Sequence, residues 1–374
     1  MFSHLKSLVS LLVIVVGITA SSTGESLEYL TAKNLTSDYC YARSYAEVAD
    51  VVKRCTHICI ENFEVPAGVT LQLNLQKHSV LLIEGTISFG VAHWDGPLMY
   101  ITGEFIQVIG GTNHLIHGRG EQYWDGNGGA AGVTKPERVM SINAKRGSFK
   151  NINIKNCPMF CVSIIGTDLT FSGFNIDNKD GFKGGLAKNT DAMGFVYSDN
   201  ILIENSNIVN QDDCINIMAS SNAVIRNVHC WGSHGLSFSS GLSNTDENND
   251  IHNVTFKDCS IGGSLNGIHI LTMPSGGRGK ISQITYRNIN IIDVTQRAIE
   301  FRQDYLRNGQ PGNNIRIDDL TLDNIYGTVT GRSAVGVYIN CGDGSCSNWN
   351  WRDVRITGAK NKDTCNFHPN GYSC

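Results

Sequence analysis

Four residues of the chain have the types and the spacing that acid–base chemistry requires. Two adjacent aspartates, Asp212 and Asp213, interrupt the apolar and amide-rich run IVNQDDCINI, with Asp191 lying 21 residues before Asp212 and His234 lying 22 residues after it. Carboxylates held close together resist joint ionisation, so one keeps a proton as an acid while another serves as a base. A solvated Asp-Asp turn is the ordinary alternative. Calcium binding is disfavoured because the spaced Asp/Asn/Gly ligand series of calcium loops is absent.

Short repeated strands are the elements that would position these residues. From about residue 100, runs of alternating Ile, Val, Leu, Phe and Thr are separated by a polar residue, as in NAVIRNVHCWGSHGLSFS. These polar anchors are spaced by 49, 22, 31, 30 and 36 residues, the first interval spanning two turns: Asn156, Asn205, Asn227, Asp258, Asn288 and Asn324. This period predicts an all-β solenoid, a parallel β-helix. A β-sandwich would need frequent Asn-Gly hairpins, which are sparse here.

A solenoid stacks positions that are whole turns apart on one face. Asp191, Asp212 and His234 would therefore lie in one line on adjacent coils, and with Asp213 they would share one patch. Consecutive strand residues point to opposite faces, so Asp212 and Asp213 can both reach solvent only where the backbone bends or bulges. We expect such a bend on the edge of an open groove.

The ends and the composition limit the classes of protein to consider. We expect a secretory signal peptide at residues 1–20, a short segment at 21–39 and one domain at 40–374, in a secreted, extracellular monomer. The helix that we expect near residues 44–55 would cap the open end of the solenoid. The formal charge of −4 does not indicate nucleic acid or an anionic membrane as partner, and no later segment is apolar enough to cross a bilayer.

The cysteines are consistent with export. All twelve follow the signal segment, and an even number in an exported chain favours disulfides over free thiols or zinc. The short separations of Cys341 from Cys346 and of Cys365 from Cys374 would close small loops. Asn34 and Asn253 fit the glycosylation acceptor pattern.

Several motifs, in order along the chain, resemble those of polygalacturonases of glycoside hydrolase family 28. They are VPAGVTLQL, two WDG motifs, NTD at 189–191, QDD at 211–213, HG at 234–235, NGIHI, QDY at 303–305 and CGDGSCSNWNW. The resemblance covers nearly the whole mature chain. It implies a right-handed parallel β-helix and a hydrolase of pectin, the galacturonan polymer, with no cofactor and no metal.

The resemblance also implies a role for each site residue. Asp212 would be the general acid, Asp191 and Asp213 would hold and deprotonate the attacking water, and His234 would tune the acid's proton or bind substrate. Substrate binding would fall to Asn189, Gln211, His269 and Tyr305. Disulfides are expected at Cys40, Cys55, Cys214, Cys230, Cys341, Cys346, Cys365 and Cys374, with Cys214 paired to Cys230. The partners of Cys59, Cys157, Cys161 and Cys259 stay open, although Cys157 and Cys161 are close enough to pair.

Hydrolysis with inversion needs an acid and a base whose carboxyl groups are about 6.5–9.5 Å apart, with the water between them. Coils of a β-helix rise by about 4.8 Å, so carboxylates of neighbouring coils can span such a gap. This geometry permits inversion, and the resemblance implies that the bonds cleaved are α-1,4-galacturonosyl bonds. Internal cutting is expected because no long insertion closes the groove.

The chain departs from the family pattern at the residues that bind the galacturonate carboxylate. The family reads Arg-Ile-Lys where this chain has His269, Ile270 and Leu271, so both fixed cations are missing. Arg278 and Lys280 are candidate replacements, about ten residues later. A lost charge-assisted bond costs about 1.5–3 kcal/mol, or about ten- to a hundredfold in affinity. Gly194 also stands where the family commonly has an aspartate.

Other functions remain open on these grounds. They are a hydrolase of methyl-esterified or otherwise modified galacturonan, a non-catalytic galacturonan-binding relative, and a hydrolase of rhamnogalacturonan or xylogalacturonan. A pectate lyase is less favoured, because that chemistry uses calcium ligands and a basic proton acceptor.

Overall fold

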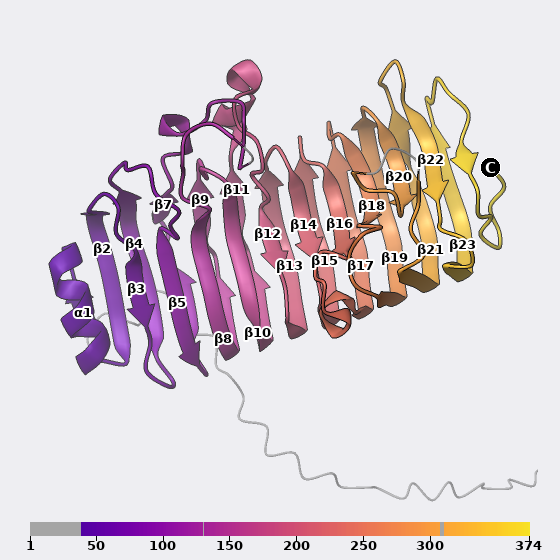
Figure 1. Ribbon diagram of the computed structural model, residues 1–374. Helices are drawn as coiled ribbons and strands as arrows, with labels where there is room; N and C mark the ends of the chain where they lie inside the picture. Colours follow the sequence, from indigo (N-terminus) through magenta and orange to yellow (C-terminus); the bar gives the residue numbers. More distant parts are fainter. Residues whose placement is uncertain (1–38, 130, 307–309) are drawn as a thin grey trace, which may run out of the picture. The chain divides into compact units, whose positions relative to one another are not determined.

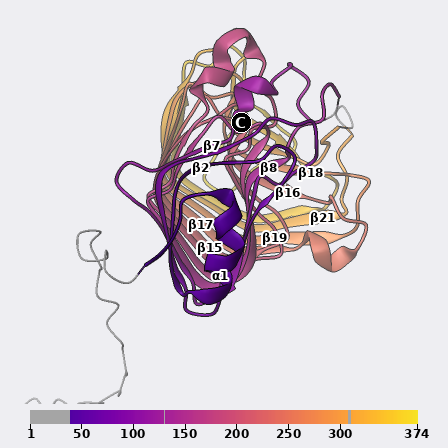
Figure 2. The same cartoon turned by 90° about the vertical axis from the view of Figure 1, so that its left-hand side faces the viewer.

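The computed structural model describes residues 39–374, except residues 130 and 307–309. In this part of the chain, parallel strands lie side by side and wind into the successive coils of a β-helix (Figure 1). The view along the stack shows the coils superimposed around a common interior (Figure 2). The predicted all-β, parallel-strand solenoid is confirmed. The expected signal peptide and Asn34 lie outside the described residues.

One face of the coils consists of short strands and bears the candidate site. Each strand pairs in parallel with its neighbours one coil away, and the first halves of β8 and β10 belong to this face. In order the strands are β3 (Leu71–Asn74), β5 (Met99–Glu104), β8 (Arg138–Lys150), β10 (Phe160–Ser172), β12 (Met193–Phe195), β14 (Asp213–Ile217), β16 (Gly235–Ser240), β18 (Asn266–Thr272), β20 (Arg297–Arg302), β22 (Val335–Asn340) and β24 (Thr364–Cys365).

The other two faces share longer strands that bend in the middle. The shorter members of these faces are β1 (Cys40–Ala42), β6 (Gln107–Gly110), β7 (Leu115–His117), β9 (Asn153–Lys155) and β11 (Asn175–Asp177). The longer members are β2 (His57–Val65), β4 (Val80–Phe89), β13 (Asp199–Val209), β15 (Ser221–Trp231), β17 (Ile251–Gly262), β19 (Gly279–Val294), β21 (Ile315–Val329) and β23 (Cys346–Thr357).

A ladder of polar residues forms the bend of the long strands. Asn205, Asn227, Asp258, Asn288 and Asn324 all adopt positive φ between 50° and 58°, a conformation that Asn and Asp tolerate better than other side chains. Their side chains bond along the stack: the Asn227 amide donates to Asn205 at 2.8 Å, that of Asn288 to Asp258 at 2.8 Å and that of Asn324 to Asn288 at 3.0 Å. Five of the six anchors found in the sequence thus turn the chain at one corner.

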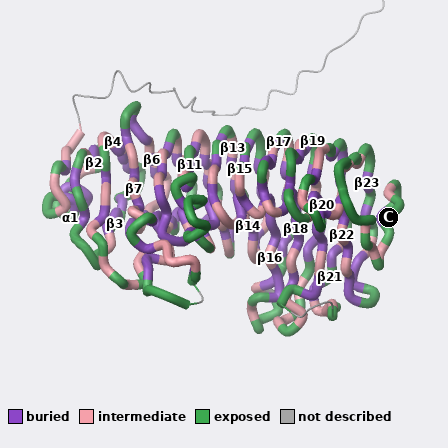
Figure 3. The backbone as a smooth tube through the Cα atoms, turned by 90° about the horizontal axis from the view of Figure 1, so that it is seen from above, coloured by how far each residue is buried: buried purple, intermediate pink, exposed green. Residues whose placement is uncertain are grey.

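The core follows from the alternation of apolar and polar residues along each strand. Buried positions recur at the same places in successive coils (Figure 3). Like side chains stack along the axis: the rings of Phe256 and Tyr286 lie 4.9 Å apart, and those of Phe149 and Phe171 lie 5.0 Å apart. Each fully buried large side chain contributes about 1.5–3 kcal/mol. Burial of side chains between stacked coils therefore stabilises the fold.

One helix packs against the first coils of the described residues, and several aromatic side chains pack near the C-terminus. Helix α1 (Tyr45–Arg54) contacts β1, β2 and β3 and buries Val48, Val51 and Val52. Short 3-10 turns are η2 (Gly120–Gln122), η3 (Lys179–Gly185) and η4 (Asp246–Asn249). Near the C-terminus, Trp349 packs against Phe367 at 4.9 Å and Trp351 against Tyr372 at 5.2 Å. Within the described residues, the model contains no helix with the length and apolar character needed to span a membrane.

Disulfides join ten of the cysteines. The pairs are Cys40–Cys55, Cys157–Cys161, Cys214–Cys230, Cys341–Cys346 and Cys365–Cys374. The expectation that the even count would favour disulfides fails for Cys59 and Cys259, which are buried free thiols in strands of different coils. Burial raises the pKa of each to about 12, so both act as small apolar side chains.

Candidate active site

Two lines of residues on adjacent coils build the site. Met193 of β12 lies opposite Ile215 of β14, and the Ala192 N–H donates to the Asp213 carbonyl at 2.9 Å, which places Asp191 beside Asp213. The His234 N–H donates to the Asp212 carbonyl at 2.7 Å, which places His234 beside Asp212. The predicted single line through Asp191, Asp212 and His234 is therefore wrong by one residue, because the register pairs Asp191 with Asp213.

The chain bends at the QDD motif, as expected. Gln211 and Asp212 form a bend, and β14 begins at Asp213. The Asn210 side-chain amide fixes this bend by donating to the carbonyls of Thr190, Asp212 and Asp213 at 2.8–2.9 Å. The two adjacent aspartates nevertheless differ in exposure: 18% of the Asp212 side chain is exposed but only 8% of that of Asp213. The expectation that both reach solvent holds for Asp212 alone.

The carboxylates are held by direct contacts. His234 Nδ1 lies 3.2 Å from Asp212 Oδ1, and the Asn189 amide donates to Asp212 Oδ2 at 3.3 Å. His269 Nε2 lies 2.9 Å from Asp213 Oδ1. One ligand-type atom from each of Asp212, Asp213 and His234 falls within 4.8 Å of the others, a spacing that could also hold a metal ion. The contacts among Asp212, Asp213 and His234, and that of Asp213 with His269, already explain why these atoms lie so close together.

The electrostatics of the cluster shift the pKa values of Asp191 and Asp212 in opposite directions. Burial, and then the charges of Asp212 and Asp213, raise the pKa of Asp191 well above its ordinary value. Burial also acts on Asp212, but the hydrogen bond and charge of His234 outweigh it and lower the pKa of Asp212. The same pair raises the pKa of His234, although burial opposes that rise. The cluster therefore favours a proton on Asp191 and an ion pair between Asp212 and His234.

These side chains open into a cleft of about 890 Å³ on the face of short strands. Its lining runs from Tyr100 on β5 to Arg302 on β20, so it crosses the coils on both sides of Asp212. Tyr305 lines the cleft with 37% of its surface exposed. Burial and the charges of Asp212 and Asp213 raise the pKa of Tyr305, so its phenol keeps its proton as a donor. A polymer lying along the cleft would pass directly over the carboxylates.

The structure brings most of the predicted site residues together, with three corrections. Asp191, Asp212, Asp213, His234, Asn189, His269 and Tyr305 all line the cleft. Gln211 does not line it, because its amide donates to the Asn178 carbonyl at 2.6 Å and accepts from the Thr190 hydroxyl at 2.9 Å.

The second correction concerns His269, which was expected to hold a substrate carboxylate. Its side chain is 3% exposed and its Nε2 contacts Asp213, so its acidic partner belongs to its own chain.

The third correction concerns the replacement cations. Neither Arg278 nor Lys280 lines the cleft, and Lys280 forms an ion pair with Asp318 at 2.9 Å.

Sequence reasoning missed the charged residues of the coil that follows His269. Arg302 of β20 lies in register with Leu271, and Glu300 with His269. Arg297 lies at the start of the same strand, and all three side chains line the cleft. The sequence RAIEFR has three charged residues among six, but only the register shows that their side chains face the cleft.

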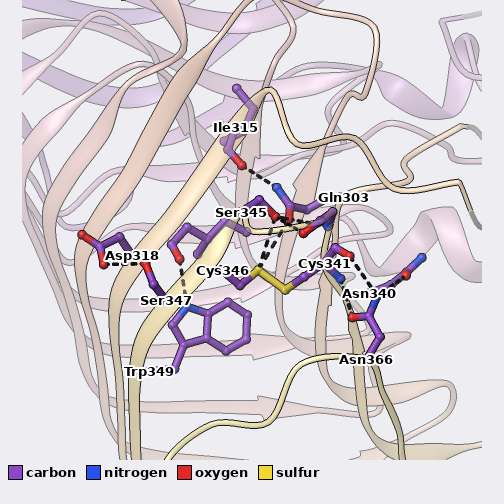
Figure 4. Close-up of a disulfide and its surroundings, with 12 residues drawn as sticks. Gln303, Ile315, Asp318, Asn340, Cys341, Ser345, Cys346, Ser347, Trp349 and Asn366 are labelled. Atoms are coloured by element: carbon purple, nitrogen blue, oxygen red, sulfur yellow. Dashed lines mark hydrogen bonds between the residues drawn. A yellow bond between two sulfur atoms is a disulfide. The ribbon is translucent and has the colours of Figure 1, made fainter.

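The QDY motif is anchored by its first residue. Gln303 is fully buried and lies between Ile315 and the loop closed by the Cys341–Cys346 disulfide (Figure 4). Its amide donates to the Ile315 carbonyl at 2.6 Å, and its oxygen accepts from the Gly342 N–H at 3.0 Å and from the Ser345 hydroxyl. Gln303 therefore fixes the end of β20, from which Tyr305 reaches the cleft.

A comparison with family models agrees with the β-helix and its clustered carboxylates. Residues 55–374 match the model of glycosyl hydrolases family 28, and the chain belongs to that family. The polygalacturonase of Phaedon cochleariae is 40% identical over 364 residues, covering 96% of this chain and 99% of that protein. Endopolygalacturonase I of Aspergillus oryzae (strain ATCC 42149 / RIB 40) is 37% identical over 339 residues, covering 90% and 91%.

A solved structure agrees with these relatives. Endopolygalacturonase I from Stereum purpureum, complexed with two galacturonate, superimposes with a TM-score of 0.80 and 29% sequence identity, covering 87% of this chain and 96% of that one. The family and these relatives make the chain a glycosidase of the polygalacturonase type.

Proposed function

We propose that the protein hydrolyses the α-1,4-galacturonosyl bonds of galacturonan internally, by a single displacement that inverts the anomeric carbon. The observation that supports this most is the convergence of Asp191, Asp212, Asp213 and His234 in one open cleft. The cleft extends over coils on both sides of Asp212, which favours internal binding of a polymer. A protein that only bound galacturonan would have no use for this charged cluster.

In this proposal Asp212 is the general acid. It is the more exposed of the two adjacent aspartates, and His234 Nδ1 lies 3.2 Å from its Oδ1. His234 supplies a proton to Asp212, and Asp212 passes it to the oxygen of the leaving sugar as the glycosidic bond breaks. His234 regains its proton from solvent after the products leave.

The attacking water is assigned to Asp191 and Asp213. These residues lie side by side on adjacent coils, and the water gives its proton to this pair as its oxygen bonds to the anomeric carbon. His269 holds Asp213 in place through its Nε2. Asn189 orients Asp212, and Tyr305 donates a hydrogen bond to the sugar near the reacting carbon.

The test is a reducing-end assay on galacturonan with the parent protein and Asp212→Asn. The parent should release sugar ends and the variant should lose at least about a hundredfold in kcat, the lower range for a general acid. Asp258→Asn is the matched control, because Asp258 belongs to the ladder at the far corner, where other coils already carry Asn. NMR of the first product should show the inverted anomer. Retained activity in Asp212→Asn would refute the assignment.

The remaining expectations belong to the same proposal. We infer that the protein is secreted and acts extracellularly as a monomer, and that its β-helix is right-handed and forms one domain capped by α1. Asn253 is the proposed glycosylation site within the described residues. Its amide donates to Asn222 at 2.6 Å, and a glycan would replace the other amide hydrogen. Mass spectrometry of the secreted protein, before and after glycosidase treatment, tests both export and modification.

A further inference from the structure

One row of outward-facing residues along the floor of the cleft is largely apolar. Ile165 is in register with Asn143, the Val196 N–H donates to the Ile164 carbonyl, and the Met218 N–H donates to the Phe195 carbonyl. Further along, Ser239 is in register with Leu271, and Leu271 with Arg302. The row thus contributes one side chain from each coil. We name its four apolar members the apolar strip: Ile165, Val196, Met218 and Leu271.

The apolar strip faces the space that substrate would occupy. All four side chains line the cleft, and Ile165 is 41% exposed while the other three are partly exposed. Met218 directly follows β14, the strand that Asp213 begins, so the strip passes the catalytic carboxylates. Ile165, Val196 and Met218 come from three consecutive coils spaced by about 4.8 Å. Leu271 lies two coils further on.

The cations of the cleft already have acidic partners. Arg302 Nε lies 2.6 Å from Asp304 and its Nη1 lies 3.5 Å from Glu300. Arg297 pairs with Glu300, and Arg138 pairs with Glu137 at 2.5 Å. Among the described lining residues there is no lysine, and both histidines contact aspartates. Among these lining residues, a free uronate carboxylate would therefore lose its hydration without meeting an unpaired cation.

We propose that the cleft selects galacturonan whose carboxyl groups are methyl esters, and that the apolar strip contacts the ester methyl groups. This inference rests on the proposed function and adds the substrate class. An ester carries no charge to desolvate, and burial of its methyl group should raise the affinity for the ester about fourfold. Leu271 is the specificity-determining position, because it stands beside Arg302, whose charge Asp304 and Glu300 already balance.

The experiment compares kcat/KM on unesterified polygalacturonate and on highly methyl-esterified galacturonan. The parent should prefer the esterified polymer by about tenfold. Leu271→Lys introduces an unpaired cation, so it should raise kcat/KM on the unesterified polymer by about tenfold and lower it on the ester. Ile292→Lys is the matched control. Ile292 is 37% exposed and lies on β19 outside the cleft, so this variant should keep the parental ratio.

The outcomes separate this inference from the proposed function. Cleavage of neither polymer would overturn both. Cleavage with a parental preference for the unesterified polymer, and an unchanged ratio in Leu271→Lys, would overturn the selection for esters alone. Met218→Ser adds no charge and serves if Leu271→Lys fails to fold in a thermal unfolding scan. It should shift the ratio of the two kcat/KM values against the ester by about fourfold, and an unshifted ratio counts against the proposal.

Discussion

Replacing Asp191 by Asn should stabilise the protein at neutral pH while abolishing hydrolysis. Burial and two neighbouring carboxylates raise the pKa of Asp191 above its ordinary value of 3.8. Between that value and the raised one, the folded state binds a proton that the unfolded chain has lost, so the free energy of unfolding falls as pH rises. The limiting slope for one proton is about 1.4 kcal/mol per pH unit. Asn cannot ionise, so Asp191→Asn removes this fall in the free energy of unfolding.

The neighbouring substitution Asp212→Asn is the matched comparison with the opposite sign. The pKa of Asp212 is lowered, chiefly because His234 outweighs burial, so ionised Asp212 contributes stability above pH 3.8 that is lost as pH falls through the lowered value. Asp212→Asn should therefore destabilise the protein at neutral pH. Both variants lose activity, so only stability distinguishes them.

Urea unfolding between pH 4 and pH 8 measures the difference. The stability of Asp191→Asn relative to the parent should rise with pH by up to about 1.4 kcal/mol per unit, then level off above the raised pKa. In thermal scans this is about 3 °C per pH unit at most, at about 2 °C per kcal/mol. A difference that stays flat with pH, or a loss of stability like that of Asp212→Asn, would refute the assignment of the retained proton to Asp191.

Three further predictions concern the supports of the site. His234→Gln should cost about 1 kcal/mol at pH 5 and less at pH 9. The stability that comes from the raised pKa of His234 is fully present below pH 6.5 and is lost as pH rises through the raised pKa. Urea unfolding at both pH values checks this. Replacing both Cys214 and Cys230 by Ala should cost about 3 kcal/mol, since they close a 16-residue separation, and equal midpoints in urea for parent and variant would contradict it. Gln303→Ala should cost at least about 3 kcal/mol by leaving the Ile315 carbonyl, the Gly342 N–H and the Ser345 hydroxyl unpaired, and it should raise KM by loosening Tyr305; a variant as stable as the parent in urea would exclude this role.

The sequence predicted the solenoid because the pattern that indicates this fold is local and repeated along the chain. Alternating apolar runs and Asn anchors recur many times, so errors at single positions do not matter. Asn156 shows this: it was grouped with the ladder, but its amide bonds to Glu121 at 2.8 Å and Asp180 at 3.1 Å. The other five anchors still gave the correct architecture.

The details of the site depended on register, which the sequence does not carry. A count of 21 residues suggested that Asp191 stacks on Asp212, whereas the coil pairs it with Asp213, and the β14–β16 register shifts again between Asp213 and Ile215. The same limitation concealed Arg302, whose position beside Leu271 becomes visible only when the coils are aligned. Cys59 and Cys259 were unpredictable for a related reason, since pairing depends on which coils place two thiols within reach.

The placement of the reacting groups near the middle of the stack has a consequence for how the protein fails under stress. In one-dimensional assemblies, opening starts at the terminal units and spreads inward, because an end unit has a neighbour on one side only. Asp191, Asp212 and His234 belong to three successive coils with many others before and after them. The protein should therefore stay active while amides near α1 and β24 first lose protection from hydrogen exchange. On heating, it should lose activity only when the interior coils unfold.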